Sequence, residues 1–346
     1  MKIAHILWSM GTGGTENMVV DIASVQSKNH DVCIFVINDW VEKYMIQKLN
    51  PKCRVVLLNR KPGSKNPLPL LNLNLRLKLF NPDIIHYHSQ RSISCVQVCH
   101  RTPRVRTIHG LGNDSAEYPQ YEKLIAISRA VLDFTAQQGF ESVEIPNGIR
   151  VNAINHHKNN YFDDGVLHFV QVSRLHIATK GQDILIRAIA ILKNKGLQNF
   201  KVHLVGDGAD ADLLKSLCEK MKVEDMVVFE GRWSQQVIYA NLSNFDMYIQ
   251  PSRDEGFGLT IAEAMAAKVP VLVSDIPGPM EVINQGSLGR SFHSEDIADC
   301  ANKIAEFIKQ GRDEAQVEEA YQYVCDHYDV SVTAQKYLEV YQSILK

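Results

Sequence analysis

The feature that most constrains the fold is an alternation of short apolar runs with helix-like segments, which starts twice along the chain. The first series of predicted strands covers residues 3–9, 32–37, 55–58, 83–88, 104–108 and 124–127. The second covers residues 167–172, 201–205, 227–230, 247–250 and 269–273. Because strands that alternate with helices form parallel sheets covered on both faces, the pattern predicts doubly wound, Rossmann-like α/β architecture.

Two domains are expected, because 346 residues exceed what one hydrophobic core usually organises. We assign residues 1–150 to the first domain and the polar segment 151–165, rich in Asn, His and Asp, to a linker. Residues 166–330 form the second domain. The amphipathic segment 331–346 is expected to be a helix that packs back on the first domain.

Residues 71–79 carry Leu at every second position, separated by Asn, Arg and Lys. Strict alternation favours a strand, yet none of the apolar residues is β-branched. Leu68, Leu71, Leu75 and Leu79 also keep the spacing of one helix face. We therefore predict a helix here.

Charge is distributed unevenly along the chain. Residues 1–150 hold 18 Lys and Arg against 12 Asp and Glu, whereas residues 151–346 hold 19 against 27. The basic residues of the first half gather at Lys52, Arg54, Arg60, Lys61 and Lys65, at Arg76 and Lys78, and at Arg101, Arg104 and Arg106. They are either solvated faces or a surface for an anionic membrane or acceptor. No aromatic-rich basic platform accompanies them, so nucleic acid is not expected as a partner.

Composition indicates a protein of the cytosol. The seven cysteines are scattered and odd in number, which fits reduced thiols. The sequence contains no run of about 18 apolar residues, so no membrane span is predicted. The first ten residues are interpreted as a strand rather than a signal peptide.

A glycine-rich turn follows the first predicted strand. Gly11, Gly13 and Gly14 precede a helix-like segment, so the turn could form a nest for a phosphate. It lacks the third glycine of a dinucleotide fingerprint and the Lys-Ser or Lys-Thr of a P-loop. A turn required only by chain geometry remains the alternative.

Histidines stand near the carboxyl ends of predicted parallel strands, at His86, His88 and His109. Ligands of doubly wound sheets bind at this edge. Three histidines could hold a metal, but uncharged rings that hydrogen-bond a polar ligand are the simpler interpretation. Cys95, Cys99 and His100 lack the second pair of a zinc finger and are expected to be packing residues.

The stretch 251–270 carries the strongest chemical signal. Glu255 and Glu263 stand eight positions apart, and Gly256 and Gly258 follow the first of them. A buried strand before the stretch and helix-forming residues after Gly258 predict a strand, a glycine-rich turn and a helix. The positive N-terminus of that helix would attract an anion, and the carboxylates could bind hydroxyl groups beside it. A sugar nucleotide has both features.

This stretch resembles the signature of glycosyltransferase family 4, whose members are retaining, use nucleotide sugars and have the GT-B fold of two Rossmann-like domains facing across a cleft. Glu-Gly-Phe-Gly-Leu at 255–259, Glu-Ala-Met-Ala at 263–266 and Pro-Val at 270–271 appear in the family's order. Further landmarks of the family are matched at 13–16, 83–86, 109–110, 145–148, 174, 180 and 206–208.

The resemblance implies roles for individual residues. The amides of Gly13 and Gly14 would approach the donor diphosphate, and Arg174 and Lys180 would bind it through their side chains. Glu255 and His109 would contact the sugar. Glu263 would bind the ribose hydroxyls, with the amides of Phe257, Gly258 and Leu259 near the phosphates. Gly206 would belong to the donor site. No metal or other cofactor is expected, since these groups take its place and no Asp-x-Asp motif is present.

The expected activity is transfer of a sugar from a UDP- or GDP-sugar to a hydroxyl of a glycan or lipid-linked acceptor at the inner face of a bacterial membrane. Lys268, where the family has a small glycine, and the shortened loop 278–281 depart from the family pattern. These two departures leave open which nucleotide and which sugar the donor carries. A nucleotide-sugar 2-epimerase, a phosphorylase and a non-catalytic sugar-nucleotide-binding subunit are the alternatives on this fold, and a dinucleotide oxidoreductase is weakened by the missing third glycine.

Overall fold

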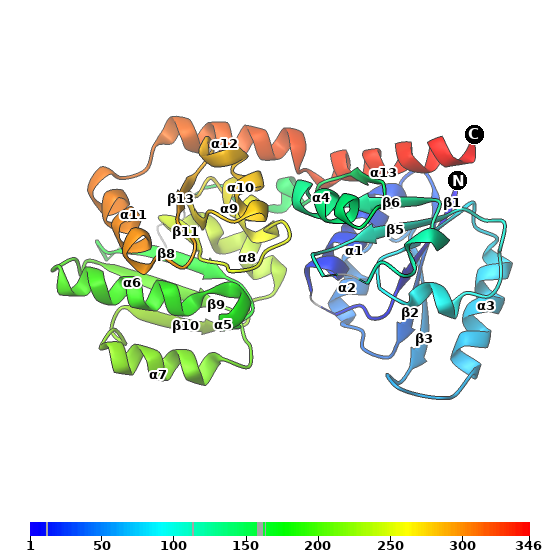
Figure 1. The fold of residues 1–346 in the computed structure, drawn as a ribbon, viewed down its shortest axis with the longest axis horizontal. Helices are drawn as coiled ribbons and strands as arrows, with labels where there is room; N and C mark the ends of the chain where they lie inside the picture. Colours follow the sequence, from blue (N-terminus) through cyan, green and yellow to red (C-terminus); the bar gives the residue numbers. More distant parts are fainter. Residues whose placement is uncertain (12, 113, 158–161, 163) are drawn as a thin grey trace. The chain divides into compact units, whose positions relative to one another are not determined.

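The computed structural model describes residues 1–346 except 12, 113, 158–161 and 163. The chain divides into two compact units, which Figure 1 shows in sequence colours. The first unit comprises Met1–Ile149 and His327–Lys346, and the second comprises Arg150–Asp326. Five residues of the expected linker at 151–165, namely 158–161 and 163, lie outside the described residues.

A seven-stranded parallel sheet forms the centre of the first unit, with strand order β3-β2-β1-β4-β5-β6-β7. Its strands are β1 (Lys2–Leu7), β2 (Asp31–Asn38), β3 (Arg54–Arg60), β4 (Ile84–Tyr87), β5 (Arg104–Ile108), β6 (Lys123–Ala126) and β7 (Ser142–Glu144). Strand order reverses between β1 and β4, where His5 pairs in register with His86. Such a switch point is where doubly wound sheets bind ligands at the carboxyl ends of their strands.

Helices cover this sheet on both sides. They are α1 (Gly14–Gln26), α2 (Lys43–Lys48), α3 (Leu68–Phe80), α4 (Arg129–Gln137) and α13 (Val330–Leu345). The C-terminal α13 packs on α1 and contributes Tyr337 and Tyr341 to the core of this unit. Helix α4 begins after Ser128, whose Oγ accepts a hydrogen bond from the Val131 N–H at 3.3 Å. The Ser128 hydroxyl thus caps the first turn of α4.

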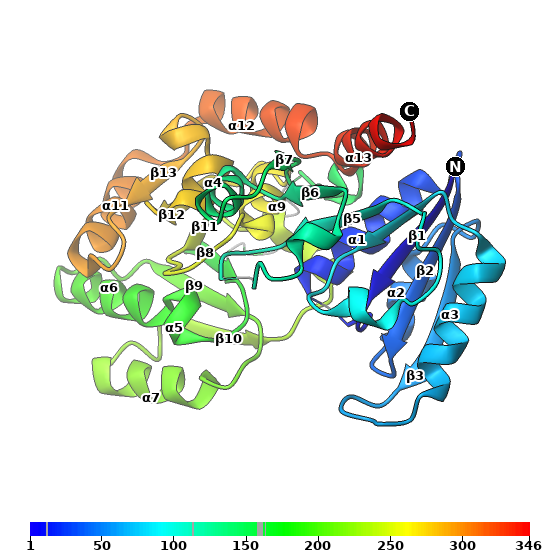
Figure 2. The same ribbon diagram turned by 45° about the vertical axis from the view of Figure 1, so that its right-hand side comes forward.

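Helix α3 confirms the helix predicted from the leucine-rich segment. Leu73 and Leu77 are buried against the sheet, whereas Leu71, Leu75 and Leu79 are exposed. The alternation of Leu with polar residues therefore arises from two apolar faces of one helix, only one of which is covered within the unit. α3 packs against β2 and β3 at the sheet's edge (Figure 2).

The second unit repeats the architecture with a six-stranded parallel sheet of order β10-β9-β8-β11-β12-β13. The strands are β8 (Leu167–Val172), β9 (Phe200–Val205), β10 (Val227–Gly231), β11 (Met247–Gln250), β12 (Val271–Ser274) and β13 (Arg290–Phe292). The helices are α5 (Ile177–Lys180), α6 (Gln182–Asn194), α7 (Ala211–Met221), α8 (Gln235–Asn241), α9 (Leu259–Ala266), α10 (Pro277–Val282), α11 (Ile297–Gln310) and α12 (Glu314–His327).

Four short elements were not expected from the sequence, namely β7, β13, α2 and α8. Each has seven residues or fewer, so its periodicity is too brief to read. The segment 174–181 contains the single turn α5. No helix among the described residues is long and apolar enough to cross a bilayer.

Candidate functional site

The stretch 251–270 folds as a strand, a turn and a helix, as predicted. β11 ends at Gln250, and α9 begins at Leu259 directly after Gly258. The first N–H groups of a helix have no partner four residues earlier, so those of α9 can bind an anion. Glu263 lies one turn into α9 and is only 5% exposed. A carboxylate so buried is stable only with hydrogen-bond or charge partners.

Lys180 and Glu255 are brought together by this fold. Lys180 Nζ lies 2.7 Å from Glu255 Oε2, and the two side chains are 22% and 18% exposed. An ammonium group has three N–H donors, so this bond uses one of them. The pair therefore places a held cation and a carboxylate side by side at the carboxyl ends of β8 and β11, where a ligand of these sheets binds.

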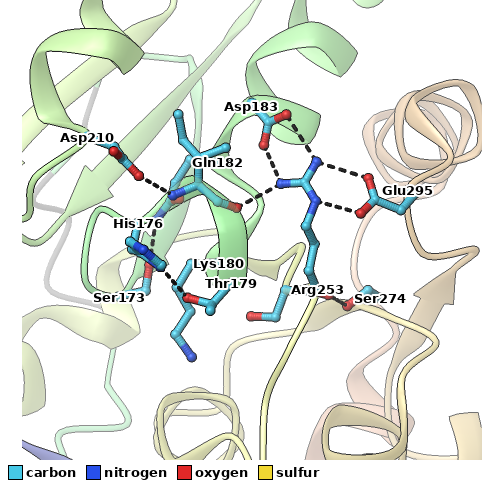
Figure 3. A network of polar contacts seen from close by, with 12 residues as sticks. Ser173, His176, Thr179, Lys180, Gln182, Asp183, Asp210, Arg253, Ser274 and Glu295 are labelled. Carbon is cyan, nitrogen blue, oxygen red and sulfur yellow. Dashed lines mark hydrogen bonds and ion pairs between the residues drawn. The ribbon is translucent and has the colours of Figure 1, made fainter.

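The loop after β8 carries Arg174, which is exposed, and is fixed by hydrogen bonds from α6 and from the chain after β9. Gln182 Nε2 donates to the Arg174 carbonyl at 2.8 Å and to Ser173 Oγ at 3.0 Å. Asp210 accepts the Ile177 N–H at 2.7 Å (Figure 3). Because its backbone is held on both sides, the loop can present the Arg174 side chain from a defined position.

Arg253 ties the loop after β11 to α5 and α6. Its guanidinium donates to both carboxylate oxygens of Asp183 at 2.6 and 3.1 Å and to those of Glu295 at 2.5 and 2.9 Å, and also to the Ile177 carbonyl at 2.8 Å (Figure 3). These carboxylates raise the pKa of Arg253. Sequence reasoning missed this residue, because Asp183 and Glu295 are 70 and 42 positions away and no local pattern connects them.

Two glycines allow close backbone contacts at these loops. A Cβ on Gly206, whose φ is +149°, would lie 1.9 Å from the Ser173 carbonyl oxygen beside Arg174. A Cβ on Gly278 would lie 2.2 Å from the Glu255 carbonyl oxygen. Gly206 therefore packs directly against the backbone of the loop that carries Arg174. Gly278, which belongs to α10 although 278–281 was expected to be a shortened loop, packs against the Glu255 backbone.

Lys268, the departure from the family pattern, ends α9 in a left-handed conformation with a φ of +56°. Its Nζ donates to Glu318 Oε2 at 2.6 Å and lies 4.5 Å from the centre of the Tyr321 ring. Both partners belong to α12. The side chain thus anchors α9 to the helix behind it.

The other predicted site residues belong to the first unit. Gly13 and Gly14 stand at the N-terminus of α1, where the Gly13 carbonyl accepts the Asn17 N–H at 3.1 Å. Thr12 of this loop lies outside the described residues. The turn is therefore the start of a 13-residue helix, which is the position of an anion-binding nest.

His109 follows β5 and is neutral at physiological pH. Burial, and then the charge of nearby Arg106, lower its pKa from 6.5 to about 3. Its Nε2 is buried and, within the described part of the chain, has no hydrogen-bond partner. A neutral imidazole with an uncommitted nitrogen can bind a hydroxyl group.

His86 and His88, expected to face a ligand, are instead packed with His5 inside the unit. His86 bonds Tyr341 and Thr107 through its two ring nitrogens, at 2.5 and 2.8 Å. His5 bonds His88 at 3.0 Å and Gln26 at 2.9 Å. The three rings could each offer a nitrogen within 4.8 Å of the others, but a metal there would have to displace these hydrogen bonds. The prediction that His86 and His88 face a ligand is wrong, because they are only 1% and 3% exposed. Tyr341 of α13 covers His86.

The fold defines a class of protein with two parallel-sheet α/β units, each with a helix N-terminus at the carboxyl edge of its sheet. In the second unit, the Lys180–Glu255 pair lies at this edge. Two family models match consecutive parts of the chain, "Glycosyltransferase Family 4" over residues 12–153 and "Glycosyl transferases group 1" over residues 153–323. The chain belongs to the family 4 glycosyltransferases of GT-B fold.

Relatives agree with this assignment. The O-antigen biosynthesis glycosyltransferase WclY of Escherichia coli is 24% identical over 100% of this chain and 99% of its own length. Protein CapJ of Staphylococcus aureus is 33% identical over 142 residues, which cover 40% of this chain and 35% of CapJ. Anabaena HepE, solved in complex with UDP and glucose, is similar in fold with a TM-score of 0.82 at 21% identity, over 99% of this chain and 100% of HepE.

Proposed function

We propose that this glycosyltransferase moves a hexose from a UDP- or GDP-sugar to a hydroxyl of a glycan or lipid-linked acceptor, with retention of anomeric configuration and without a metal. The observation that carries the proposal is the Lys180–Glu255 pair beside the N-terminus of α9. WclY, which aligns along its whole length, supports an O-antigen or lipopolysaccharide acceptor. The reaction would take place in the cytoplasm, at the inner face of the membrane.

The leaving group explains the need for cations. As the bond between sugar and diphosphate breaks, negative charge grows on the phosphate oxygens. Arg174, Lys180 and the amides of Phe257, Gly258 and Leu259 would stabilise that charge, each charge-assisted hydrogen bond contributing about 1.5–3 kcal/mol. The amides of Gly13 and Gly14 would add to it. A divalent metal would then not be needed to stabilise the charge on the diphosphate.

The carboxylates have different tasks. Glu263, buried in α9, would accept hydrogen bonds from the ribose hydroxyls. Glu255 would hold Lys180 and contact the sugar, and neutral His109 would bind a sugar hydroxyl from the first unit. Gly206 would contribute by holding the Arg174 loop. Retention without a covalent enzyme intermediate requires attack on the same face that the diphosphate leaves.

Nucleotide-sugar binding provides the first test. A panel of UDP- and GDP-sugars is screened by thermal shift, since a ligand at 100 times its dissociation constant stabilises the folded state by about 2.7 kcal/mol. At least one sugar nucleotide should raise the melting temperature, and Glu263→Ala should reduce that shift. Failure of the whole panel would contradict a donor site.

Reaction class is tested by NMR of the best donor. With acceptor present, the new glycosidic bond should keep the donor's anomeric configuration, and addition of EDTA should not slow transfer. Conversion of the donor to its 2-epimer without acceptor would instead identify an epimerase. Unchanged donor under both conditions, despite binding, would favour a non-catalytic subunit.

A further inference from the structure

We propose that the outer face of α3 docks on an anionic lipid surface. Four leucines, which we call the leucine face, stand on the side of α3 away from the sheet and are 57–73% exposed. They are Leu68, Leu71, Leu75 and Leu79. Four large exposed apolar side chains on one helix face leave a contiguous patch in water, which marks an interaction site.

The face is separate from the packing of the helix. Leu73 and Leu77, at 0% exposure, and Phe80 attach α3 to the first unit. Asn74 adds hydrogen bonds to the Leu70 and Cys95 carbonyls at 2.7 and 2.9 Å. Because these residues already hold the helix, the leucine face is not needed for folding.

Charge identifies the partner. Residues 43–82, which contain α3, hold nine Lys and Arg and no Asp or Glu. At about 100° per residue, Arg76 and Lys78 fall on opposite flanks of the leucine face. Lys61 and Lys65 precede the helix and are exposed. Apolar side chains flanked by cations are the pattern of helices that lie in the interface of an anionic bilayer.

The structure also narrows the basic surface expected from the sequence. Arg106 is buried, at 2% exposure, and cannot reach a membrane. Arg54 pairs with Asp31 at 2.6 Å and stacks over Phe80. The exposed cations on α3 itself are therefore Arg76 and Lys78, which flank the leucine face.

Alternative occupants fit less well. A second copy of the chain would bring two basic segments together, and like charges at an interface disfavour association. With 13 residues, α3 is too short to cross a bilayer, so it would lie on the surface. An anionic lipid surface satisfies both the leucines and the cations.

Vesicle flotation tests the proposal with two triple variants, each compared with a matched triple control. Leu71→Gln, Leu75→Gln and Leu79→Gln remove the leucine face, and Leu213→Gln, Val237→Gln and Leu345→Gln replace three other exposed apolar residues as the matched control. Lys61→Gln, Lys65→Gln and Lys78→Gln remove charge beside α3. Lys220→Gln, Lys309→Gln and Lys346→Gln remove the same charge from other exposed positions.

The wild-type chain should float with vesicles of phosphatidylcholine and phosphatidylglycerol and much less with phosphatidylcholine alone. Its affinity should fall as salt rises. The leucine-face variant should bind at least about 10-fold more weakly, and the lysine variant about 100-fold more weakly, at about 1 kcal/mol per charge. Both control variants should bind like the wild type.

Equal flotation of the leucine-face variant and the wild type would overturn the proposal, as would absence of binding to anionic vesicles. A wild-type dimer that the leucine-face variant dissociates, without vesicle binding, would assign the face to self-association instead. The thermal shift with a sugar nucleotide reports separately on the donor site. Neither triple variant changes a residue of that site, so failure of membrane docking and failure of the proposed transfer are distinguishable.

Discussion

Lys180 donates a 2.7 Å hydrogen bond from Nζ to Oε2 of Glu255, across 75 positions of sequence. The bond joins the turn α5 to the loop after β11. The Thr179 carbonyl reinforces this joint by accepting the N–H groups of Arg253 and Asp254 at 2.9 and 3.1 Å. The Lys180 ammonium and the Glu255 carboxylate, which come from different segments, are thus held in a fixed position relative to each other.

Glu255→Gln and Lys180→Gln should each reduce transfer at least about 100-fold, because in the proposed mechanism each removes a charge that acts on the leaving group or the sugar. Steady-state kinetics with the donor identified by thermal shift would measure this. Lys193→Gln breaks a comparable 2.6 Å pair with Asp225, which is 66% exposed, and should leave transfer unchanged. Full activity in both site variants would remove the pair from the mechanism.

Gly206→Ala should lower the free energy of unfolding by about 2–4 kcal/mol and weaken donor binding. The added Cβ must move the Ser173 carbonyl, and the φ of +149° strains any L side chain. Gly196→Ala is the control, since its φ of +80° is also left-handed but open space surrounds it. That variant should lose only about 1–2 kcal/mol and keep donor affinity. Denaturant unfolding and donor titration measure both quantities.

Arg253→Lys should raise the donor dissociation constant about 10-fold while the charge is kept. A lysine cannot reproduce the paired hydrogen bonds to Asp183 and Glu295, so the α5 loop with Lys180 loses its anchor. Arg312→Lys, which weakens a local pair with Glu314, should leave the constant unchanged. Equal donor affinity of Arg253→Lys and wild type would show that the loop is held without the guanidinium.

Acid should destabilise the first unit. Burial lowers the pKa of His5 to about 4 and of His109 to about 3, so both stay neutral in the folded state while the unfolded chain takes up protons below pH 6.5. The stability present above pH 6.5 is therefore lost as pH falls, by about 1.5 kcal/mol per histidine between pH 6.5 and 5.

Urea unfolding at several pH values measures this slope. His5→Gln should flatten it by one histidine's contribution, because Gln takes up no proton. His293→Gln should not flatten it, since the hydrogen bond and charge of Asp275 raise the pKa of that exposed ring, so its contribution has the opposite sign. An unchanged slope in His5→Gln would show that the ring is protonated in the folded state.

Much of the fold and the chemical character of the site could be predicted from the sequence. Apolar runs alternating with helix-like segments predict parallel sheets, and the strands of the two sheets other than β7 and β13 overlap the predicted strand ranges. The glutamates at 255 and 263, with Gly258 between them, could be read because strand, turn and helix are local. The helix α3 was predicted as well, but a pattern of leucines does not say which face is covered.

Only the tertiary structure decided which distant residues meet. Arg253 bonds Asp183 and Glu295, Gly206 packs against the Ser173 carbonyl, and Tyr341 of α13 bonds His86 of β4. All of these contacts join segments far apart in the chain. Periodicity reports the local backbone and its burial, whereas these contacts depend on strand order and on which loops share an edge of a sheet. For this reason the sequence could name Glu255 and Lys180 separately, and the fold alone places them 2.7 Å apart.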